Sequence, residues 1–486
     1  MTKVIRWFSV LFALAWVIGL SACSDSGSSD DGSLPPPPVT STKTVVANGV
    51  ITGIGSVYVN GERYGTDDAS VTIDDDPADL LQLNVGHYVE LKGHEHTDGA
   101  HDAEFIRYHN VLEGPICSID AVAGSFVAVG QTVRVTLETV FGDGIEPASI
   151  EGLAVGDVVE VSGIVPADGV IDATRIDIRP DGGPFDVSGY VTDVAVAQQR
   201  FNLGALVVDY SAANMEDFTA GEPAVGDLVK VTGSTFLADG ALLALHVELR
   251  SDDYLAAGPG DLVAVEGVIE GFASVTDFRV AGWDVTTTAT TMYEHGTAST
   301  LANGVAVIVK GVADTDGALV AQKIAFREVS KIRIVAQLDD VSPDGLELLG
   351  VQLIVGDTAV LQDMSALALR EFDLSDLAVG NWLDVRGYED PAGSGTVIAT
   401  HLVRIDPASS VRIRGPFREA APPNFDIVSV LVTTSDTTRF VIEGNIRITA
   451  EEFFAQAPGE LVEAWGVWTA PVLNAERVEL KTSDAE

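Results

Sequence analysis

The chain has 486 residues, of which 72 are acidic and 28 are lysine or arginine, so its formal net charge is −44. Phosphate binding needs clustered lysine and arginine, so this charge argues against nucleic acid as a partner, and equally against adhesion to anionic lipid surfaces. Only two cysteines occur, which leaves no framework of disulfides to staple the fold.

The N-terminus carries the pattern of a secretory signal. Lys3 and Arg6 precede an apolar run over residues 7–20, which is too short for a typical spanning helix and suits the core of a signal peptide. The run ends in Leu20-Ser21-Ala22-Cys23. This ending resembles the lipobox of bacterial lipoproteins, and the resemblance implies cleavage after residue 22 and a lipid on Cys23. An uncleaved N-terminal anchor with an incidental cysteine is the alternative.

The residue after Cys23 indicates a destination. It is Ser24 rather than aspartate, which by the usual Gram-negative sorting pattern favours the outer membrane, although Asp25 follows. We therefore expect a lipid-anchored protein of the cell envelope, located at the outer membrane and facing either the periplasm or the cell surface. The membrane is then a partner through the lipid alone.

Residues 23–44 are rich in serine and aspartate and contain four consecutive prolines at 35–38. Such a segment cannot bury enough apolar surface to order itself, and its prolines make it extended. We expect residues 1–22 to be the signal peptide and residues 23–44 to be a disordered tether.

A repeated phrase organises the rest of the chain. It occurs clearly at Val85–Gly93, Val155–Gly163 and Val225–Gly233, and weaker copies begin at Asn303 and Val379 and again at Pro458. The first glycines of the six copies lie 70, 70, 78, 76 and 79 residues apart. An internal repeat at such a period decides the architecture before any single residue does.

Each copy alternates apolar and polar residues, as a strand with one face in water does. In the second copy, Val159 and Val161 share one face, while Glu160 and Ser162 point the other way. The first four phrases lead to an Asp-Gly pair, a strong hairpin signal because both residues tolerate the positive φ of a tight turn. These pairs are Asp98-Gly99, Asp168-Gly169, Asp239-Gly240 and Asp316-Gly317.

Further parts recur upstream of each phrase. An opening strand contains a glycine or another small residue, a short strand ends in a glycine turn, and a third strand leads to a polar stretch of one or two helical turns. Residues 365–372 and 449–454 have the pattern of short capped helices.

Three strands, a small helix and a two-strand hairpin are the order of the OB-fold, a five-stranded barrel. An immunoglobulin-like sandwich would need about seven strands in about 100 residues. We therefore predict an all-β chain, a tandem array of six small OB-like barrels that gain stability by burying surface between neighbours. The predicted units span 45–110, 111–183, 184–257, 258–329, 330–409 and 410–486, the last two being diverged.

The phrase Val-Gly-Asp-x-Val-x-Val-x-Gly, followed by Asp-Gly and a tail such as Ala173-Thr174-Arg175-Ile176, resembles the bacterial family called domain of unknown function 5666. The resemblance covers residues from about 45 to 481 and is closest in units one to three. It implies tandem OB-like barrels in a secreted protein or lipoprotein, and it brings no established activity, substrate or catalytic residue.

Histidine is concentrated in the first unit, where five of the eight occur. On a strand, His94 and His96 point to the same side, and His101 returns toward them across the turn. With Asp98 and Asp102 they form a candidate site for zinc, copper or nickel. A solvated polar hairpin tip is the alternative, since no standard metal-ligand spacing is matched.

Motifs of hydrolases, phosphate loops and dinucleotide-binding folds are absent from the sequence. We therefore expect a protein that is not an enzyme, has no catalytic residues and needs no cofactor outside the metal hypothesis. Its barrels are expected to bind an envelope protein or a glycan, or to act as a structural array. Cys117 is predicted to be a buried, inert thiol. Trp283, Trp382, Trp465 and Trp468 are predicted to pack in cores or between units, with stacking on a sugar or peptide in an OB groove as the alternative.

Overall fold

The computed structural model describes residues 43–481 except 168, 180–183, 219–220, 251–255 and 344. The predicted signal peptide, Cys23 and the tether up to residue 42 lie outside the described residues. The last two residues of the predicted tether belong to the fold, since Lys43 and Thr44 open the first strand. Within the described ranges, no helix has the length and apolar character needed to cross a membrane.

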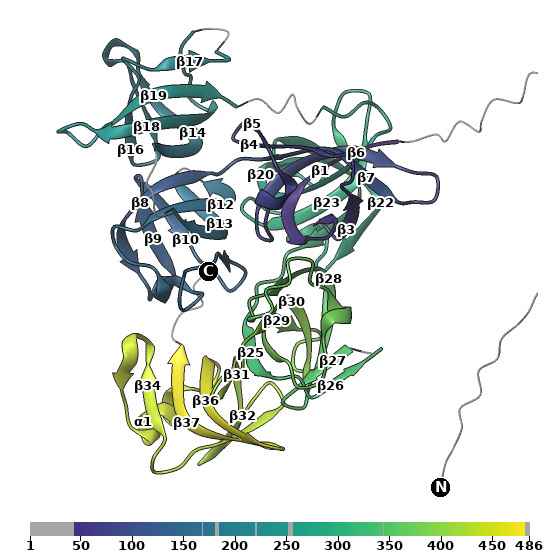
Figure 1. Cartoon of the computed structure of the whole chain (residues 1–486), viewed down its shortest axis with the longest axis vertical. Helices are drawn as coiled ribbons and strands as arrows, with labels where there is room; N and C mark the ends of the chain where they lie inside the picture. Colours follow the sequence, from purple (N-terminus) through teal and green to yellow (C-terminus); the bar gives the residue numbers. More distant parts are fainter. Residues whose placement is uncertain are drawn as a thin grey trace, which may run out of the picture. The chain divides into compact units, whose positions relative to one another are not determined.

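The described residues build six small barrels in chain order (Figure 1). Barrel 1 contains β1 (Lys43–Gly53), β2 (Val57–Val59), β3 (Glu62–Gly65), β4 (Ser70–Ile73), β5 (Asp76–Ala78), β6 (Tyr88–Glu95) and β7 (His101–Tyr108). Barrel 2 contains β8 (Leu112–Asp120), β9 (Ser125–Ala128), β10 (Gln131–Arg134), β11 (Val140–Phe141), β12 (Val158–Ala167) and β13 (Val170–Ile178). Barrel 3 contains β14 (Phe185–Ala195), β15 (Arg200–Leu203), β16 (Leu206–Asp209), β17 (Asn214–Glu216), β18 (Leu228–Phe236) and β19 (Leu242–Leu249).

The second half of the chain repeats this plan. Barrel 4 contains β20 (Leu262–Ser274), β21 (Asp277–Val280), β22 (Trp283–Glu294), β23 (Ala306–Ala313) and β24 (Leu319–Phe326). Barrel 5 contains β25 (Ile332–Gln337), β26 (Asp340–Ser342), β27 (Gly345–Leu348), β28 (Val351–Asp363), β29 (Trp382–Glu389) and β30 (Thr396–Ile405). Barrel 6 contains β31 (Val411–Ala421), β32 (Asn424–Ile427), β33 (Val430–Thr433), β34 (Arg439–Ile442), β35 (Ile446–Arg447), α1 (Ala450–Gln456), β36 (Leu461–Thr469) and β37 (Val472–Lys481).

Every barrel closes in the strand order first, second, third, fifth, fourth and back to first. In barrel 1 the first strand β1 pairs antiparallel with β2 and with β6, and β3 and β4, the two halves of the third strand, pair parallel with β7. The antiparallel pair of β6 and β7 completes the ring. This is the topology of the OB-fold, so the predicted fold class is confirmed.

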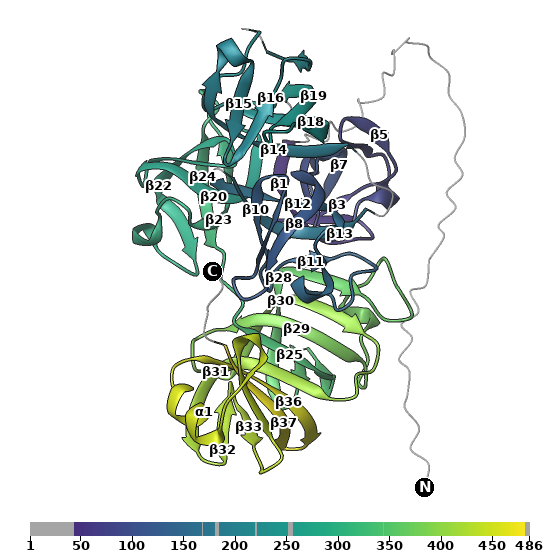
Figure 2. The same cartoon turned by 90° about the vertical axis from the view of Figure 1, so that its left-hand side faces the viewer.

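The predicted helix at 449–454 is confirmed as α1. The Thr449 hydroxyl accepts a hydrogen bond from the amide of Glu452, whose carboxylate in turn accepts from the amide of Thr449, a capping box. Phe453 is buried against the ring of Phe417 and its neighbours, and Figure 2 shows α1 beside the strands of barrel 6.

The predicted helix at 365–372 is wrong. The carboxylate of Asp363 accepts hydrogen bonds from the amides of Ser365 and Leu369, which folds this segment into a turn. Ala368 adopts a left-handed φ of 46° inside that turn. A single turn of 3-10 helix follows only at Leu374–Asp376.

Packing explains why the first strand of a barrel contains a glycine. A Cβ on Gly114 would lie 2.3 Å from Cγ2 of Val129, and a Cβ on Gly49 would lie 2.4 Å from Oδ1 of Asn60. Val129 and Asn60 each stand in the turn between the second and third strands, with positive φ. The missing side chain therefore makes room for this turn to fold over the first strand.

First strands also join barrels in pairs. β1 pairs parallel with β20, which joins barrels 1 and 4, while β8 pairs antiparallel with β14 and β25 with β31. In β1, β20, β8, β14 and β31 the paired residues precede the part of the strand that bonds to the short second strand. In barrel 5 the separate strand β26, which follows β25, bonds to β27 instead. An edge left open within the barrel is thus covered by another barrel. Neighbours in sequence pair as 2 with 3 and 5 with 6, but barrel 1 pairs with the fourth repeat.

The predicted wet face of the fourth strands is wrong at several positions. Glu160 is 4% exposed and Ser162 is fully buried, although both point away from the core of their own barrel. The Tyr108 hydroxyl of barrel 1 donates to Glu160 at 2.8 Å, and the Tyr88 amide donates to Ser162 at 2.8 Å. The side facing away from one core is therefore covered by a second barrel.

Candidate functional site

The histidine hairpin of barrel 1 divides its side chains between two faces. His94 lies opposite Asp102 in the ladder, whereas His101 lies opposite Glu95. Residues directly opposite in an antiparallel pair share a face, and successive residues alternate. His94 and Asp102 therefore lie on one face, and His101 lies on the other.

Contacts of the side chains agree with this register. His96 Nε2 lies 2.6 Å from Asp102 Oδ2, and His94 Nε2 lies 3.4 Å from Glu104. His101 instead packs on the buried ring of Tyr64, with ring centroids 5.4 Å apart. The structure places His94, His96 and Asp102 on one face of the hairpin, with only His96 and Asp102 in contact, and places His101 on the other face.

The remaining predicted ligand, Asp98, serves the turn. Its Oδ1 accepts a hydrogen bond from the amide of Ala100 at 3.1 Å, which is ordinary turn chemistry. Across the described part of the chain, no group of three or more histidine, cysteine, aspartate or glutamate side chains is arranged to hold a metal ion.

Cys117 is exposed, so the prediction of a buried thiol is wrong. Ile116 pairs with Ala128 and Ser118 with Val127, which leaves Cys117 as the extra residue of a β-bulge. A bulge turns its extra side chain out of the alternation that the sequence pattern implies.

The four tryptophans are half-buried and contact protein side chains. Trp283, Trp382 and Trp468 pack against barrel cores, and the guanidinium groups of Arg412 and Arg477 stack on Trp465 at 5.0 and 4.7 Å. These contacts fit the packing role expected from the sequence.

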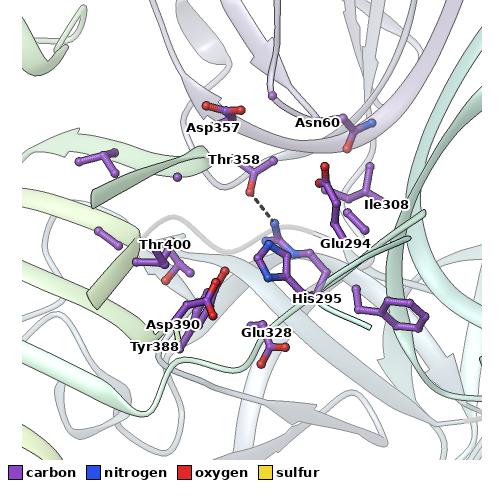
Figure 3. Close-up of a pocket in the computed structure, with 18 of the residues that line it drawn as sticks. Asn60, Glu294, His295, Ile308, Glu328, Asp357, Thr358, Tyr388, Asp390 and Thr400 are labelled. Carbon is purple, nitrogen blue, oxygen red and sulfur yellow. Dashed lines mark hydrogen bonds between the residues drawn. The ribbon is translucent and has the colours of Figure 1, made fainter. Parts of the chain in front are cut away.

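Sequence reasoning missed two cavities that several repeats form together. The first, which we name cavity A, has a volume of about 450 Å³ and is lined by residues of barrels 1, 2, 4 and 5. Figure 3 shows Asn60, Glu294, His295, Thr358 and Tyr388 around it. No motif marks it, because its walls come from positions far apart in the chain.

The cations of cavity A are already engaged. Lys310 Nζ lies 2.7 Å from Glu62, and Lys323 Nζ lies 2.7 Å from Glu294. Arg327 donates to the Thr358 hydroxyl at 3.2 Å, the contact drawn as a dashed line in Figure 3.

Carboxylates dominate the rest of that cavity. Glu328, Asp357 and Asp390 line it in exposed positions. Burial raises the pKa of Tyr388, and the neighbouring charges of Glu328 and Asp390 raise it further. Cavity A is therefore an open, acidic crevice, in which the tyrosine stays protonated.

The second cavity, cavity B, also measures about 450 Å³ and is lined by residues of barrels 1 to 4. Its walls include the aliphatic side chains of Ile164, Val165, Leu228 and Val268. Three arginines and three carboxylates line it together with two tyrosines: Arg107, Arg250, Arg279, Glu90, Asp227, Glu270, Tyr88 and Tyr190.

Buried charges hold the barrels around these cavities. Lys230 Nζ of barrel 3 lies 2.5 Å from Asp74 of barrel 1, and Arg386 of barrel 5 donates to the carbonyl of Leu137 in barrel 2 at 2.8 Å. Glu160, Lys230 and the fully buried Glu463 occupy the same place in their repeats, three residues before the final glycine of the phrase. A charged residue recurring there is the one sequence signal of these interfaces.

A neutral histidine lies inside the contact of barrels 1 and 2. His87 stacks on Tyr108 with ring centroids 4.1 Å apart and an interplanar angle of 6°. Burial holds the pKa of His87 well below its usual value, and the nearby charge of Arg175 lowers it further. Burial likewise raises the pKa of Tyr108 and of Glu160.

Comparison with known proteins gives a family. A family model described as "Domain of unknown function (DUF5666)" matches residues 48–107, 113–177, 188–248, 266–325 and 334–402. No curated protein matches the sequence. A solved Drosophila structure described as "drosophila Unr CSD456" is 11% identical, with 45% of this chain and 97% of that chain covered and a TM-score of 0.12.

The matched ranges correspond to barrels 1 to 5. Barrel 6 lies beyond them, although its strands β31, β32, β33, β36 and β37 pair in the same order as those of the other barrels. By five tandem matches that together cover more than half of its length, the chain belongs to the DUF5666 family.

Proposed function

We propose that this protein is a lipid-anchored component of the bacterial cell envelope, in which the barrels form a non-enzymatic binding and structural array outside the cytoplasm. The sorting pattern after Cys23 supports a place at the outer membrane, with the array facing the periplasm or the cell surface. An envelope protein or a glycan is the partner that this placement favours.

The observation that carries the array is the burial of paired charges between barrels. Removing a charge from water costs several kcal/mol unless a partner compensates it, so such pairs require the two surfaces to stay together. The ion pair of Lys230 with Asp74 links barrels 3 and 1 in this way, and the hydrogen bond from the neutral Tyr108 hydroxyl to the buried Glu160 carboxylate links barrels 1 and 2. Barrels that are linked by such buried contacts keep a fixed geometry, and so do the cavities between them.

Labelling with a fatty-acid analogue tests the anchor. We expect the full chain, expressed in a Gram-negative host, to incorporate the label and to fractionate with outer membranes. Cys23→Ala should lose the label, while Cys117→Ala, the matched control at the second cysteine, should keep it. An unlabelled wild-type chain, or a labelled Cys23→Ala chain, would contradict the anchor.

A divalent-metal function is the second candidate, and the hairpin register favours a narrower set of ligands for it. His94, His96 and Asp102 share one face, so they are the side chains that would bind zinc, copper or nickel. His101 and Asp98 have other contacts. Titration of the full chain with zinc, copper and nickel tests this candidate.

A further inference from the structure

The wall of cavity A carries more negative than positive charge. Six carboxylates and three cations line this cavity, so the wall has a formal charge of −3 when histidine is neutral. These charged residues are Glu62, Glu138, Glu294, Glu328, Asp357, Asp390, Lys310, Lys323 and Arg327. Carboxylates gathered around one cavity repel one another, and a cation placed among them relieves that repulsion. The charge of the wall therefore favours a cationic ligand.

The cations of the wall leave four of these carboxylates without an ion pair. The two lysines bind Glu62 and Glu294, and Arg327 Nε lies 3.3 Å from Glu266 Oε1, which is outside the wall. Within the described part of the chain, no lysine, arginine or histidine forms an ion pair with the other four wall carboxylates, Glu138, Glu328, Asp357 and Asp390. The excess negative charge of the wall is therefore free to act on a ligand.

Three of the unpaired carboxylates act on one tyrosine. Burial raises the pKa of Tyr388, and the charges of Glu328, Asp390 and Glu138 raise it further, against the opposite effect of Arg327. Figure 3 shows Glu328, Asp390 and Tyr388 in the same cavity. Glu328 and Asp390 are exposed and Tyr388 is half-buried, so a ligand in the cavity can reach them. An ammonium group held there would also lie near an aromatic ring, which attracts cations.

Aliphatic side chains form another part of the same wall. Ile354 is 44% exposed, and the half-buried Val355 and Ile398 also line the cavity. Methylene groups of a ligand gain free energy by covering such side chains, whereas a hydrated metal ion does not. The described residues also contain no group of three or more side chains arranged to hold a metal ion. The wall therefore suits a cation with an aliphatic body.

We propose that cavity A binds an aliphatic polyamine, a chain of methylene groups that carries several ammonium groups. Its ammonium groups pair with the carboxylates that have no partner in the wall, and its methylene groups pack on Ile354 and the aliphatic side chains of the same wall. Three positive charges, as in spermidine, equal the excess negative charge of the wall. A volume of about 450 Å³ is within the usual range for a small organic ligand. This site goes beyond the proposed function, because it requires neither the lipid anchor nor a protein or glycan partner.

Calorimetry on the full chain tests the proposal. The probes are spermidine, hexamethylenediamine with two ammonium groups, and hexanediol as the uncharged counterpart of the diamine. Magnesium chloride and trilysine represent a metal ion and a basic peptide. We expect saturable binding of spermidine to one site, with a dissociation constant of about 0.1 mM or below at low salt. The diamine should bind about tenfold more weakly and hexanediol not at all, and added salt should weaken the binding of both amines because it screens their charges.

Paired variants separate the cavity from the acidic surface in general. Glu328→Gln combined with Asp390→Asn removes two charges from the wall and should weaken spermidine binding about tenfold or more. Asp316→Asn combined with Asp436→Asn removes two charges at exposed positions outside the cavity. This control has the same net charge and should bind spermidine within about twofold of the wild type, since well-separated surface charges are screened.

A second pair of variants adds a charge instead of removing one. Ile354→Lys places an ammonium group in the wall and should also weaken spermidine binding about tenfold or more. Val341→Lys, at an exposed valine of the same barrel outside the cavity, should bind as the wild type does. If the variant of Glu328 and Asp390 does not fold, the comparison of Ile354→Lys with Val341→Lys decides alone.

The contrary outcomes are distinct. The absence of saturable spermidine binding, equal losses in the cavity variants and their controls, or binding of magnesium or trilysine in place of spermidine would each overturn the polyamine proposal. A chain that is lipidated at Cys23 and reaches the outer membrane, yet binds no spermidine, would leave the envelope function standing and remove this inference alone.

Discussion

The hydroxyl of Tyr108 donates a hydrogen bond to Glu160 Oε1 at 2.8 Å, across the contact between barrels 1 and 2. Both side chains are almost fully buried, so neither has water as a substitute partner. Glu160 also pairs with Arg179. One tyrosine on the fifth strand of one repeat thus satisfies a carboxylate on the fourth strand of the next.

Tyr108→Phe keeps the ring and removes this donor. We expect it to lower the free energy of unfolding by about 1–3 kcal/mol, because the Glu160 carboxylate stays buried with one bond fewer. Urea unfolding followed by circular dichroism measures the change. Tyr58→Phe, at an exposed ring, should stay within about 0.5 kcal/mol of the wild type. Equal effects in the two variants would contradict a role for the hydroxyl.

Acid should weaken the fold through buried histidines. Burial holds the pKa values of His87 and His401 well below their usual range, so both are neutral in the folded chain. An unfolded histidine takes up a proton below about pH 6.5. Stability is therefore complete above that pH and falls as the pH drops below it, by up to about 1.4 kcal/mol per unit and per histidine.

The measurement compares urea unfolding at pH 7 and pH 5.5 in the wild type and in His87→Gln. In His87→Gln the free energy of unfolding should fall less between pH 7 and pH 5.5 than it does in the wild type. In His246→Gln, at an exposed histidine of β19, it should fall as much as in the wild type. Burial raises the pKa of Glu160, so the contribution of this carboxyl to the stability of the fold increases as the pH falls and partly offsets the loss caused by the histidines. The difference between wild type and His87→Gln isolates the histidine, and an unchanged slope would refute its role.

Arg386 links barrels 5 and 2. Its guanidinium donates to the carbonyls of Leu137 and Thr139 at 2.8 and 3.2 Å and lies 3.6 Å from Asp384. Arg386→Met should cost about 3–5 kcal/mol, the usual loss when one partner of a buried ionic group is removed. Hydrogen exchange should also accelerate around residues 137–139, which belong to the other barrel.

A control for Arg386 is available in barrel 6. Arg439 is exposed and donates to Asn445 at 2.9 Å, so Arg439→Met should change the free energy of unfolding by about 0.5 kcal/mol or less. If Arg386→Met leaves exchange around 137–139 as it is in the wild type, the contact between barrels 2 and 5 does not hold in solution.

Gly114 should tolerate no side chain while Val129 is present. A Cβ at 114 would lie 2.3 Å from Cγ2 of Val129, so we expect Gly114→Ala to cost about 1–3 kcal/mol through overpacking. Adding Val129→Ala should recover part of the loss. Barrel 4 shows the relaxed form of this contact, since a Cβ on Gly267 would lie 3.2 Å from Cβ of Ala281. Simple additivity of the two single variants would contradict the clash.

The register of the histidine hairpin indicates which histidines could coordinate one metal ion. Zinc, copper and nickel are titrated into the full chain by calorimetry, with elemental analysis after dialysis. His96→Ala should remove any bound metal, because His96 lies beside Asp102 on the face shared with His94. His101→Ala should leave the metal content unchanged, since its ring lies against Tyr64. A wild-type chain without stoichiometric metal would end the metal hypothesis.

The sequence by itself determined the single repeat. Alternation at period two placed Val159 and Val161 in a core, the Asp-Gly pairs marked hairpins, and the order of segments matched one barrel topology. These are local signals, because strand alternation and turn chemistry depend on residues close together in the chain. The bulge at Cys117 and the turn at Asp363 escaped them, since one extra residue or one side-chain contact changes the local pattern.

Only the tertiary structure decided which repeats meet and what fills the contacts. The alternating pattern around Glu160 and Lys230 predicts a strand face exposed to water, yet both residues are buried against barrel 1. The pairing of β1 with β20 joins segments more than 200 residues apart, and cavities A and B exist only where such barrels come together. A period-two pattern records that a side chain points away from its own core, but whether water or another barrel covers it depends on contacts that no local pattern encodes.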